Sequence, residues 1–211
     1  VWPVALSFRA GIGPATGALV SFVMAAVIAG RALRRSYPYP RLGGANVITL
    51  GRLALASALV APLLAGIGPS WSLFGLALVA LLLDGADGWL ARRQGLVSAF
   101  GARFDMEVDA ALALVLALSA AMASDAGLLA VLLGVPRYLF AAAAWRWPWM
   151  QRELPERFSR KVVCVLQLGV LITLQAPVVP ADVALVLVPV VAAALAWSFA
   201  VDVRWLRRQR V

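Results

Sequence analysis

Long uncharged apolar runs, separated by short polar connections, dominate the pattern of residues along the chain. Ala, Leu, Val and Gly fill these runs without the alternation of apolar and polar positions that is typical of a half-buried strand. About 20 mostly apolar residues are enough for a helix to cross the hydrocarbon core of a bilayer. We therefore predict seven membrane-spanning helices, at residues 11–30, 46–66, 71–91, 104–123, 127–146, 161–177 and 182–203.

The predicted fold class is an all-α polytopic integral membrane protein, because a helix is the only open structure that satisfies its own backbone hydrogen bonds in lipid. Composition agrees with this prediction. Of the 211 residues 63% are hydrophobic and 14% are charged, and the mean hydropathy is +0.90. So few polar residues cannot cover the core of a water-soluble globule.

Basic residues lie in every second connection or at the ends of the spans that flank it, and after the last predicted span. The connections at 66–70, 124–127 and 177–181 contain no Lys or Arg. Because cytoplasmic loops collect positive charge, this alternation predicts a cytoplasmic C-terminus and accounts for the net charge of +9 without a nucleic-acid partner. The basic residues concerned are Arg31, Arg34, Arg35, Arg41, Arg52, Arg92, Arg93, Arg103, Arg146, Arg152, Arg157, Arg160, Lys161, Arg204, Arg207, Arg208 and Arg210.

The first predicted span has a second interpretation, the apolar core of a signal peptide. Such cores are shorter and follow a basic segment, whereas only Arg9 precedes residues 11–30. We therefore expect a retained helix. The predicted organisation is an additional N-terminal helix with its basic cytoplasmic connection, residues 1–44, followed by one membrane domain, residues 45–211.

Five of the ten acidic residues lie within 26 positions, at the end of the third predicted span and the start of the fourth. An ionised carboxylate inside a bilayer costs at least about 2.5 to 3.5 kcal/mol, so such a cluster indicates a site. Asp84 and Asp87 are three residues apart and Asp105 and Asp109 four apart, so each pair shares one helix face. Glu107 lies between the second pair and is predicted to point away from their face.

Carboxylate oxygens are the ligands that Mg²⁺ and Mn²⁺ prefer, and a pair of such ions can polarise a phosphate and position an attacking oxygen. The sequence contains no His and one Cys, Cys164, which excludes the usual zinc ligand sets. Two alternatives remain. The acids could neutralise the arginines at a wet membrane edge, or they could belong to a carboxylate-coupled transporter, although a transporter does not require the glycines around them.

The acidic stretch resembles the signature of the CDP-alcohol phosphotransferase family, D-x2-D-G-x2-A-R-x8-G-x3-D-x3-D, at every fixed position. The resemblance extends over about residues 45–205, which correspond to the six-helix core of the family. The matching residues are Asp84, Asp87, Gly88, Ala91, Arg92, Gly101, Asp105 and Asp109.

The resemblance implies transfer of a substituted phosphate group from a CDP-linked donor to an alcohol, with release of CMP. It implies that Asp84, Asp87, Asp105 and Asp109 hold two Mg²⁺ or Mn²⁺ ions and that Asp109 also deprotonates the acceptor hydroxyl. Such a reaction consists mainly of positioning and charge neutralisation, which these parts can supply. The residues that would shape the CDP site are Gly88, Ala91, Arg92 and Gly101.

Two further segments resemble the family. Asn46 to Arg52 is similar to its N-x-I-T-x-x-R pattern, so Asn46 and Thr49 are candidates for the CDP site, unless they only cap the start of their helix. Lys161 to Gln167 is similar to its K-x-x-T-x-x-Q pattern, with Cys164 in place of the usual Thr.

An arginine inside a span is costly unless it meets an anion, and Arg137 is predicted near the middle of the fifth span. We interpret it as part of an acceptor or lipid-phosphate pocket, with an ion pair to one of the four aspartates as the alternative. The proposed acceptor-binding residues are Arg137, Arg160, Lys161 and Gln167, and they favour an anionic acceptor.

Small family members with one membrane domain take CDP-diacylglycerol as the donor, so the resemblance implies a phosphatidyltransferase of phospholipid biosynthesis. The alternative is a CDP-choline or CDP-ethanolamine type of enzyme that acts on diacylglycerol. We expect an enzyme of the bacterial inner membrane, with its site open to the cytoplasm and membrane lipid around it. Family members often form dimers, so a homodimer is an expectation that no residue of the sequence specifies.

Overall fold

Helices account for all the regular structure that the computed structural model describes, which covers residues 1–123, 127–152, 154–155 and 157–209. This agrees with the predicted all-α class. The helices are α1 (Trp2–Ser7), α2 (Ile12–Ser36), α3 (Gly44–Ala58), α4 (Val60–Leu64), α5 (Trp71–Gln94), α6 (Ala99–Ala123), α7 (Gly127–Gly134), α8 (Pro136–Arg146), the 3-10 helix η1 (Pro148–Gln151), α9 (Phe158–Thr173) and α10 (Ala181–Arg208).

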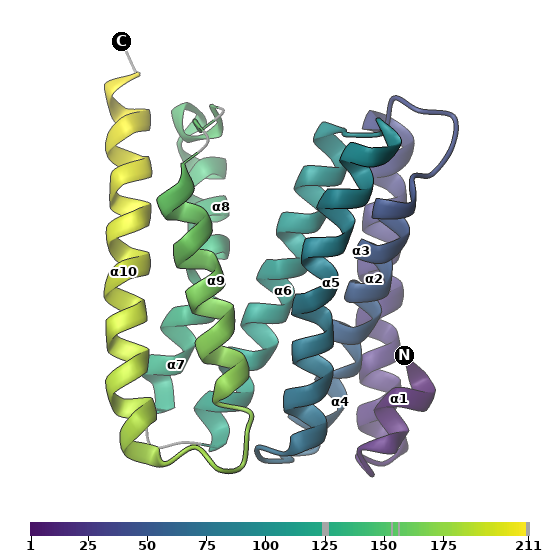
Figure 1. Ribbon diagram of the computed structural model, residues 1–211, viewed down its shortest axis with the longest axis vertical. Helices are drawn as coiled ribbons and strands as arrows, with labels where there is room; N and C mark the ends of the chain where they lie inside the picture. The colour runs from purple at the N-terminus through teal and green to yellow at the C-terminus, as the bar shows by residue number, and fades with distance from the viewer. Residues whose placement is uncertain (124–126, 153, 156, 210–211) are drawn as a thin grey trace.

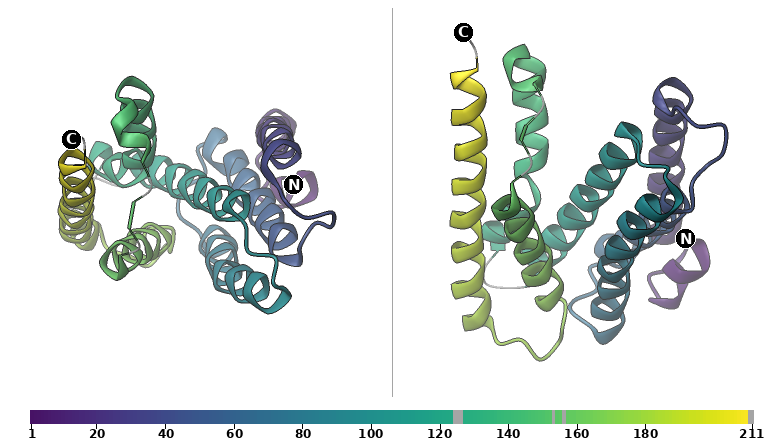
Figure 2. Two further views of the ribbon diagram at one scale, coloured as in Figure 1. Left: turned by 90° about the horizontal axis from the view of Figure 1, so that it is seen from above. Right: turned by 45° about the horizontal axis from the view of Figure 1, so that its top comes forward.

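Helix α6 runs obliquely through the middle of the molecule and joins its two halves (Figures 1 and 2). On one side it packs against α3, which packs on α5, and on the other against α7 and α9. Small and branched apolar side chains fill the interfaces, among them Ala80, Leu112, Ala117 and Leu171. Alanines at these positions let the helix backbones approach closely, which is how helices associate when lipid supplies no hydrophobic driving force.

Five helical segments are long and apolar enough to cross a membrane: Ile12–Ser36, Gly44–Leu64, Trp71–Gln94, Ala99–Ala123 and Asp182–Arg208. Large apolar side chains such as Ile28, Leu82 and Val190 are more than half exposed. In water such a surface would be unfavourable, and in a bilayer it contacts lipid. The chain is therefore a polytopic integral membrane protein.

The prediction of seven unbroken spans is wrong for the fifth and sixth. Residues 127–146 form two helices, α7 and α8, because Pro136 has no N–H to donate and its ring clashes with the preceding turn. The sixth predicted span, 161–177, forms α9, which has 16 residues. The helix ends before Leu174, where tight turns begin, so it is shorter at its C-terminal end than predicted. An apolar run predicts that a segment lies in the membrane, but it does not predict where a helix within that segment breaks.

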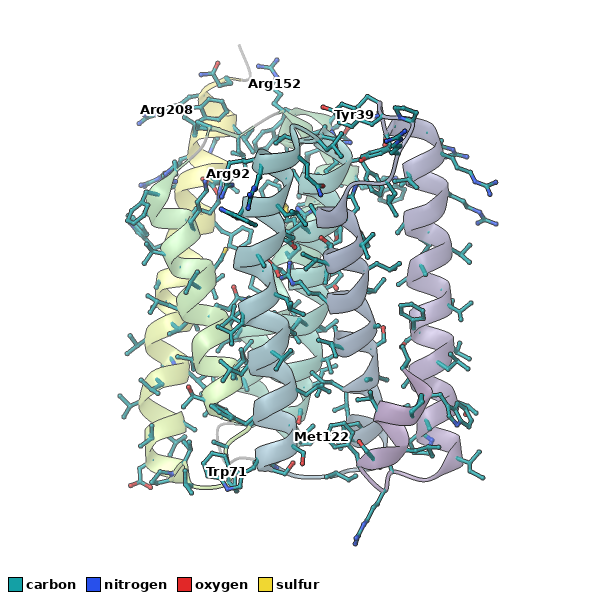
Figure 3. All side chains as sticks on the ribbon, turned by 45° about the vertical axis from the view of Figure 1, so that its right-hand side comes forward. Tyr39, Trp71, Arg92, Met122, Arg152 and Arg208 are labelled. Carbon is teal, nitrogen blue, oxygen red and sulfur yellow. The ribbon has the colours of Figure 1, made fainter. Side chains whose placement is uncertain are left out.

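Basic side chains collect at one end of the bundle, as the alternation of charged connections predicts. Figure 3 shows Arg92, Arg152 and Arg208 at that end and Trp71 and Met122 at the opposite end. The connection at 124–126 and Arg210, which belong to the predicted charge pattern, lie outside the described residues. The compartment that each end faces stays a prediction.

The predicted N-terminal span forms helix α2, and a short helix that we did not predict, α1, precedes it. Helix α2 packs against α1, α3 and α4, and its residues Ala15 and Ala18 are buried in these contacts. The predicted boundary between residues 44 and 45 falls at the start of α3. Its meaning as a domain boundary stays a prediction.

Helices α6 and α7 approach so closely at Gly134 that a side chain there has no room. A Cβ atom on Gly134 would lie 2.8 Å from Cβ of Ala117 and 2.9 Å from Cα of Leu114. We expect Gly134→Ala to push α7 away from α6 and to lower the free energy of unfolding by about 1 to 3 kcal/mol. Thermal unfolding in detergent would show this as a lower melting temperature.

The matched control is Gly169→Ala, in the interior of α9, where an added Cβ would meet no atom within 4 Å. Alanine favours a helix over glycine by about 0.5 to 1 kcal/mol, so this variant should melt at or slightly above the wild-type temperature. If the two variants have the same melting temperature, the close contact of α6 with α7 does not limit stability.

Candidate active site

The four aspartates of the predicted cluster lie on two consecutive antiparallel helices, α5 and α6. Gly95 ends α5 in the left-handed conformation, with a φ of 66°. Its N–H donates to the carbonyl of Arg92 and the N–H of Leu96 donates to that of Ala91, the hydrogen-bond pattern of a Schellman motif. This turn directs the chain into α6, so Ala91 and Arg92 lie at the end of α5 that adjoins the start of α6.

Arg52 of α3 joins all four carboxylates. Its Nη2 lies 2.8 Å from Oδ1 of Asp84 and its Nη1 lies 2.9 Å from Oδ2 of Asp87. The same two nitrogens also contact Asp105 and Asp109. The third donor, Nε, bonds to the carbonyl oxygen of Ala80 at 3.1 Å.

The charge pattern placed Arg52 among the basic residues at the ends of the first two predicted spans, and this prediction is wrong. Its side chain is 0% exposed and lies within the acidic cluster. The available signal was its position three residues after Thr49, which places both on one face of α3. Charge counting alone does not show which face of a helix a residue occupies.

The aspartates differ in how much solvent-accessible surface they keep. Asp84, Asp105 and Asp109 are about one-third exposed, whereas the side chain of Asp87 is 6% exposed. One carboxylate oxygen from each of Asp84, Asp105 and Asp109 lies within 4.8 Å of the other two. Three oxygen donors at this separation fit a hard divalent cation.

Charge within the cluster also favours a cation. Four carboxylates face one guanidinium, so three negative charges are left over among these five groups. Like charges this close repel one another, and burial in a membrane protein increases the cost. The chemistry of the donor set and its charge therefore fit Mg²⁺ or Mn²⁺.

Thr49 and Asn46, proposed for the CDP site, both face the cluster region. Thr49 Oγ1 lies 3.0 Å from Oδ2 of Asp87, to which it donates, and 3.1 Å from the carbonyl of Ala45 as an alternative acceptor. Asn46 is buried, and its Oδ1 lies 3.2 Å from where a Cβ on Gly101 would be. Helix α3 begins after Gly43 without a side-chain cap, so these residues do not serve as its cap.

Gly88 and Gly101 of the signature leave different amounts of room. A Cβ on Gly101 would crowd Asn46 and also Ser98, whose Oγ would be 3.2 Å away. A Cβ on Gly88 would meet only the end of Arg92, at 3.4 Å. Gly101 therefore allows α3 to approach α6, and Gly88 leaves the surface beside Arg92 uncovered.

Glu107 points away from the aspartate pair of α6, as its spacing predicts, and forms an ion pair with Arg137. Arg137 is the second residue of α8, directly after the break at Pro136, so it lies at the start of a helix and not within one unbroken span. The alternative that it pairs with one of the four aspartates is not what the structure shows. Its Nε is buried and has no hydrogen-bond partner within the described part of the chain.

The other proposed acceptor residues have separate partners. Arg160 lies 3.3 Å from Oδ2 of Asp202, and Arg157 lies 2.9 Å from Oδ1 of the same carboxylate. Gln167 donates to the carbonyl of Leu133, next to the break between α7 and α8. Lys161 is exposed at the start of α9.

Asp202 was not among the predicted site residues. It is 5% exposed on α10, where it holds two arginines that the charge pattern assigned to a loop. An acidic residue within an apolar span was the signal that could have identified it.

Comparison with known protein families identifies a family to which most of the chain is similar. The family model of the CDP-alcohol phosphatidyltransferases matches residues 43–201, which include the four aspartates and Arg52. No match was found among curated proteins or solved structures. The chain belongs to the CDP-alcohol phosphatidyltransferase family, whose members transfer phospholipid head groups from CDP-alcohols and use divalent metals.

Proposed function

We propose that this protein is a phosphatidyltransferase of phospholipid biosynthesis, which transfers the phosphatidyl group of CDP-diacylglycerol to the hydroxyl of an anionic alcohol. The observation that supports the proposal most is the convergence of Asp84, Asp105 and Asp109, whose oxygens lie within 4.8 Å of one another. These aspartates belong to the motif on which the family resemblance rests. The donor class follows from that resemblance.

The proposed cation site consists of Asp84, Asp105 and Asp109, with Asp87 as a more buried fourth carboxylate. Mg²⁺ or Mn²⁺ held there would neutralise the diphosphate of the donor and polarise the phosphorus that is attacked. Asn46, Gly88, Ala91, Arg92 and Gly101 would bind the nucleotide part, next to the turn between α5 and α6. Thr49 would orient Asp87, to which it donates a hydrogen bond.

Asp109 would act as the general base. It accepts the proton of the acceptor hydroxyl, and the acceptor oxygen forms a bond to the phosphorus that carries the diacylglycerol. The bond between that phosphorus and the oxygen bridging to the cytidine phosphate breaks, and CMP leaves with the bridging oxygen. Exposure of about one-third leaves the Asp109 side chain accessible to an acceptor.

The anionic character of the acceptor is inferred from the basic side chains on α8 and α9. Arg137 keeps a buried Nε without a partner within the described residues, and a phosphate oxygen could accept this hydrogen bond. Arg157 and Arg160 share Asp202, and their Nη2 groups also donate to Ser159 Oγ and to the carbonyl of Pro155. The other N–H groups of the two guanidiniums would bind a further anion. Lys161 follows directly on α9. Gln167 would stabilise the break between α7 and α8 through its hydrogen bond to the carbonyl of Leu133, and this break positions Arg137.

We expect Arg137→Ala to lower kcat/KM for the acceptor by about one to two orders of magnitude. The physical reason is the loss of a charge-assisted hydrogen bond, which is worth about 1.5 to 3 kcal/mol. The KM for the donor should change much less. Steady-state kinetics at varied acceptor concentration would measure the effect, with Arg93→Ala as a control that changes neither constant.

The ion pair with Glu107 requires a second variant. Glu107→Gln removes the partner of Arg137 and keeps the guanidinium, so it should leave acceptor kinetics close to wild type. If Glu107→Gln and Arg137→Ala reduce acceptor kcat/KM equally, or if Arg137→Ala lowers only thermal stability, Arg137 has a structural role and the inference of an anionic acceptor is wrong.

A comparison of CDP-linked donors tests the proposed function as a whole. Purified protein in detergent with Mn²⁺ is incubated with CDP-diacylglycerol and a set of alcohols, or with CDP-choline or CDP-ethanolamine and diacylglycerol, and CMP is measured. We expect CMP only with CDP-diacylglycerol, increased most by an alcohol phosphate. CMP from the soluble donors would indicate the head-group transferase, and no CMP from any pair would favour a carboxylate-coupled transporter.

The cellular setting is part of the proposal. We infer the inner membrane of a bacterium, with the basic end of the bundle, the aspartate cluster and the C-terminus on the cytoplasmic side. A homodimer stays a prediction. Surface labelling of single cysteines placed at the two ends of the bundle in a Cys164→Ser background would test the orientation.

A further inference from the structure

The most buried charged side chain within the described residues is Arg52, and its contacts are distributed evenly over the acidic cluster. Nη2 faces Asp84 and Asp109, and Nη1 faces Asp87 and Asp105. The hydrogen bonds of Arg52 to Asp87, Asp105 and Asp109 use one oxygen of each carboxylate. One carboxylate oxygen from each of Asp84, Asp105 and Asp109 is placed to share a cation.

Neutralisation of the cluster is a condition for this part of the fold. Four carboxylates that converge from α5 and α6 would separate if no positive charge lay between them, because repulsion is strong where water is excluded. Arg52 supplies one positive charge and reaches all four groups from α3. Its Nε is fixed on the carbonyl of Ala80, which aligns the guanidinium with the cluster.

We propose that Arg52 is a resident counter-ion of the active site, which keeps the four carboxylates together in the metal-free protein and shares their neutralisation with divalent cations when these bind. The inference rests on the cation site of the proposed function. It assigns Arg52 as a positioning residue, since it acts through the aspartates. The wild-type fold then does not depend on metal, and a protein without Arg52 does.

The experiment measures thermal unfolding of the purified protein in detergent, once with EDTA and once with Mn²⁺, and compares wild type with Arg52→Gln. Removal of one partner from a buried charge cluster is strongly destabilising, so in EDTA the variant should melt roughly 10 °C below wild type. Mn²⁺ should recover at least half of this loss, whereas it should shift the wild-type melting temperature by less. Direct Mn²⁺ binding, measured by electron paramagnetic resonance, should be at least as tight in the variant.

Two further variants make the test independent of whether Arg52→Gln folds. Arg52→Lys keeps the charge and should melt closer to wild type than to Arg52→Gln in EDTA, with a Mn²⁺ shift larger than that of wild type. Arg93→Gln is the matched control. Its guanidinium lies 5.0 Å from the centre of the Trp89 ring near the end of α5, and its Mn²⁺ shift should equal that of wild type.

Equal Mn²⁺ shifts in wild type, Arg52→Gln and Arg52→Lys, weaker Mn²⁺ binding in Arg52→Gln, or unfolding of the wild type in EDTA would each overturn the inference. A wrong role for Arg52 can be distinguished from a wrong proposed function. If wild type binds Mn²⁺ and releases CMP only with metal, but the Arg52 variants respond like wild type, then only the role of Arg52 is wrong. If wild type neither binds Mn²⁺ nor releases CMP, the cation site itself is wrong.

Discussion

Asp109→Asn is expected to reduce the rate of phosphatidyl transfer by about 10² to 10⁴, the usual contribution of a general base. Asparagine has nearly the shape of aspartate but cannot accept the hydroxyl proton, while Asp84 and Asp105 remain to hold a cation. Binding of the CDP-linked donor should therefore largely survive. Transfer would be measured as CMP release at saturating donor and acceptor, and donor binding by equilibrium titration.

The control for Asp109→Asn is Asp182→Asn, the same chemical change in the exposed first turn of α10. We expect wild-type transfer from this variant, because Asp182 begins α10 at the end opposite Arg208, which Figure 3 shows among the other basic residues. An Asp109→Asn protein that loses donor binding as severely as turnover would mean that Asp109 is only a cation ligand.

Asp84→Asn and Asp105→Asn should each change the metal requirement. Either substitution removes one of the three charged oxygen donors that lie within 4.8 Å of one another. The loss of a charge-assisted interaction, about 1.5 to 3 kcal/mol, should raise the Mn²⁺ concentration for half-maximal CMP release by at least about tenfold, and turnover should fall with it. A Mn²⁺ titration of CMP release measures both quantities.

Glu107→Gln provides the comparison on the same helix. Glu107 lies two residues from both Asp105 and Asp109 but pairs with Arg137 of α8. Its substitution should leave the Mn²⁺ requirement unchanged. If Glu107→Gln and Asp105→Asn raise the requirement equally, the effect reflects general negative charge on α6 and not a specific ligand.

Sequence was sufficient for the parts of the molecule that depend on local pattern. Apolar runs predicted α2, α5, α6 and α10, because the bilayer sets a minimum length for a spanning helix. Helical spacing predicted that Asp84 and Asp87 share a face, as do Asp105 and Asp109, and the four contact one guanidinium. The spacing also predicted that Glu107 faces elsewhere.

What the sequence did not predict depends on tertiary contacts. Arg52 comes 32 positions before the first aspartate, and only the packing of α3 on α5 and α6 brings it into the cluster. Asp202 meets Arg157 because α10 packs against α9. The helix breaks at Pro136, so Arg137 lies at the start of α8. A hydropathy pattern does not predict this break, because hydropathy contains no information on backbone hydrogen bonds.

We propose that the carboxylates of α5 and α6 hold divalent cations that are required for transfer from a CDP-linked lipid. The most direct test of this proposal is CMP release from CDP-diacylglycerol by purified wild-type protein, first in EDTA and then after Mg²⁺ or Mn²⁺ is restored. We expect no CMP in EDTA and full recovery of CMP release with either metal ion. Full CMP release in EDTA would contradict the proposal.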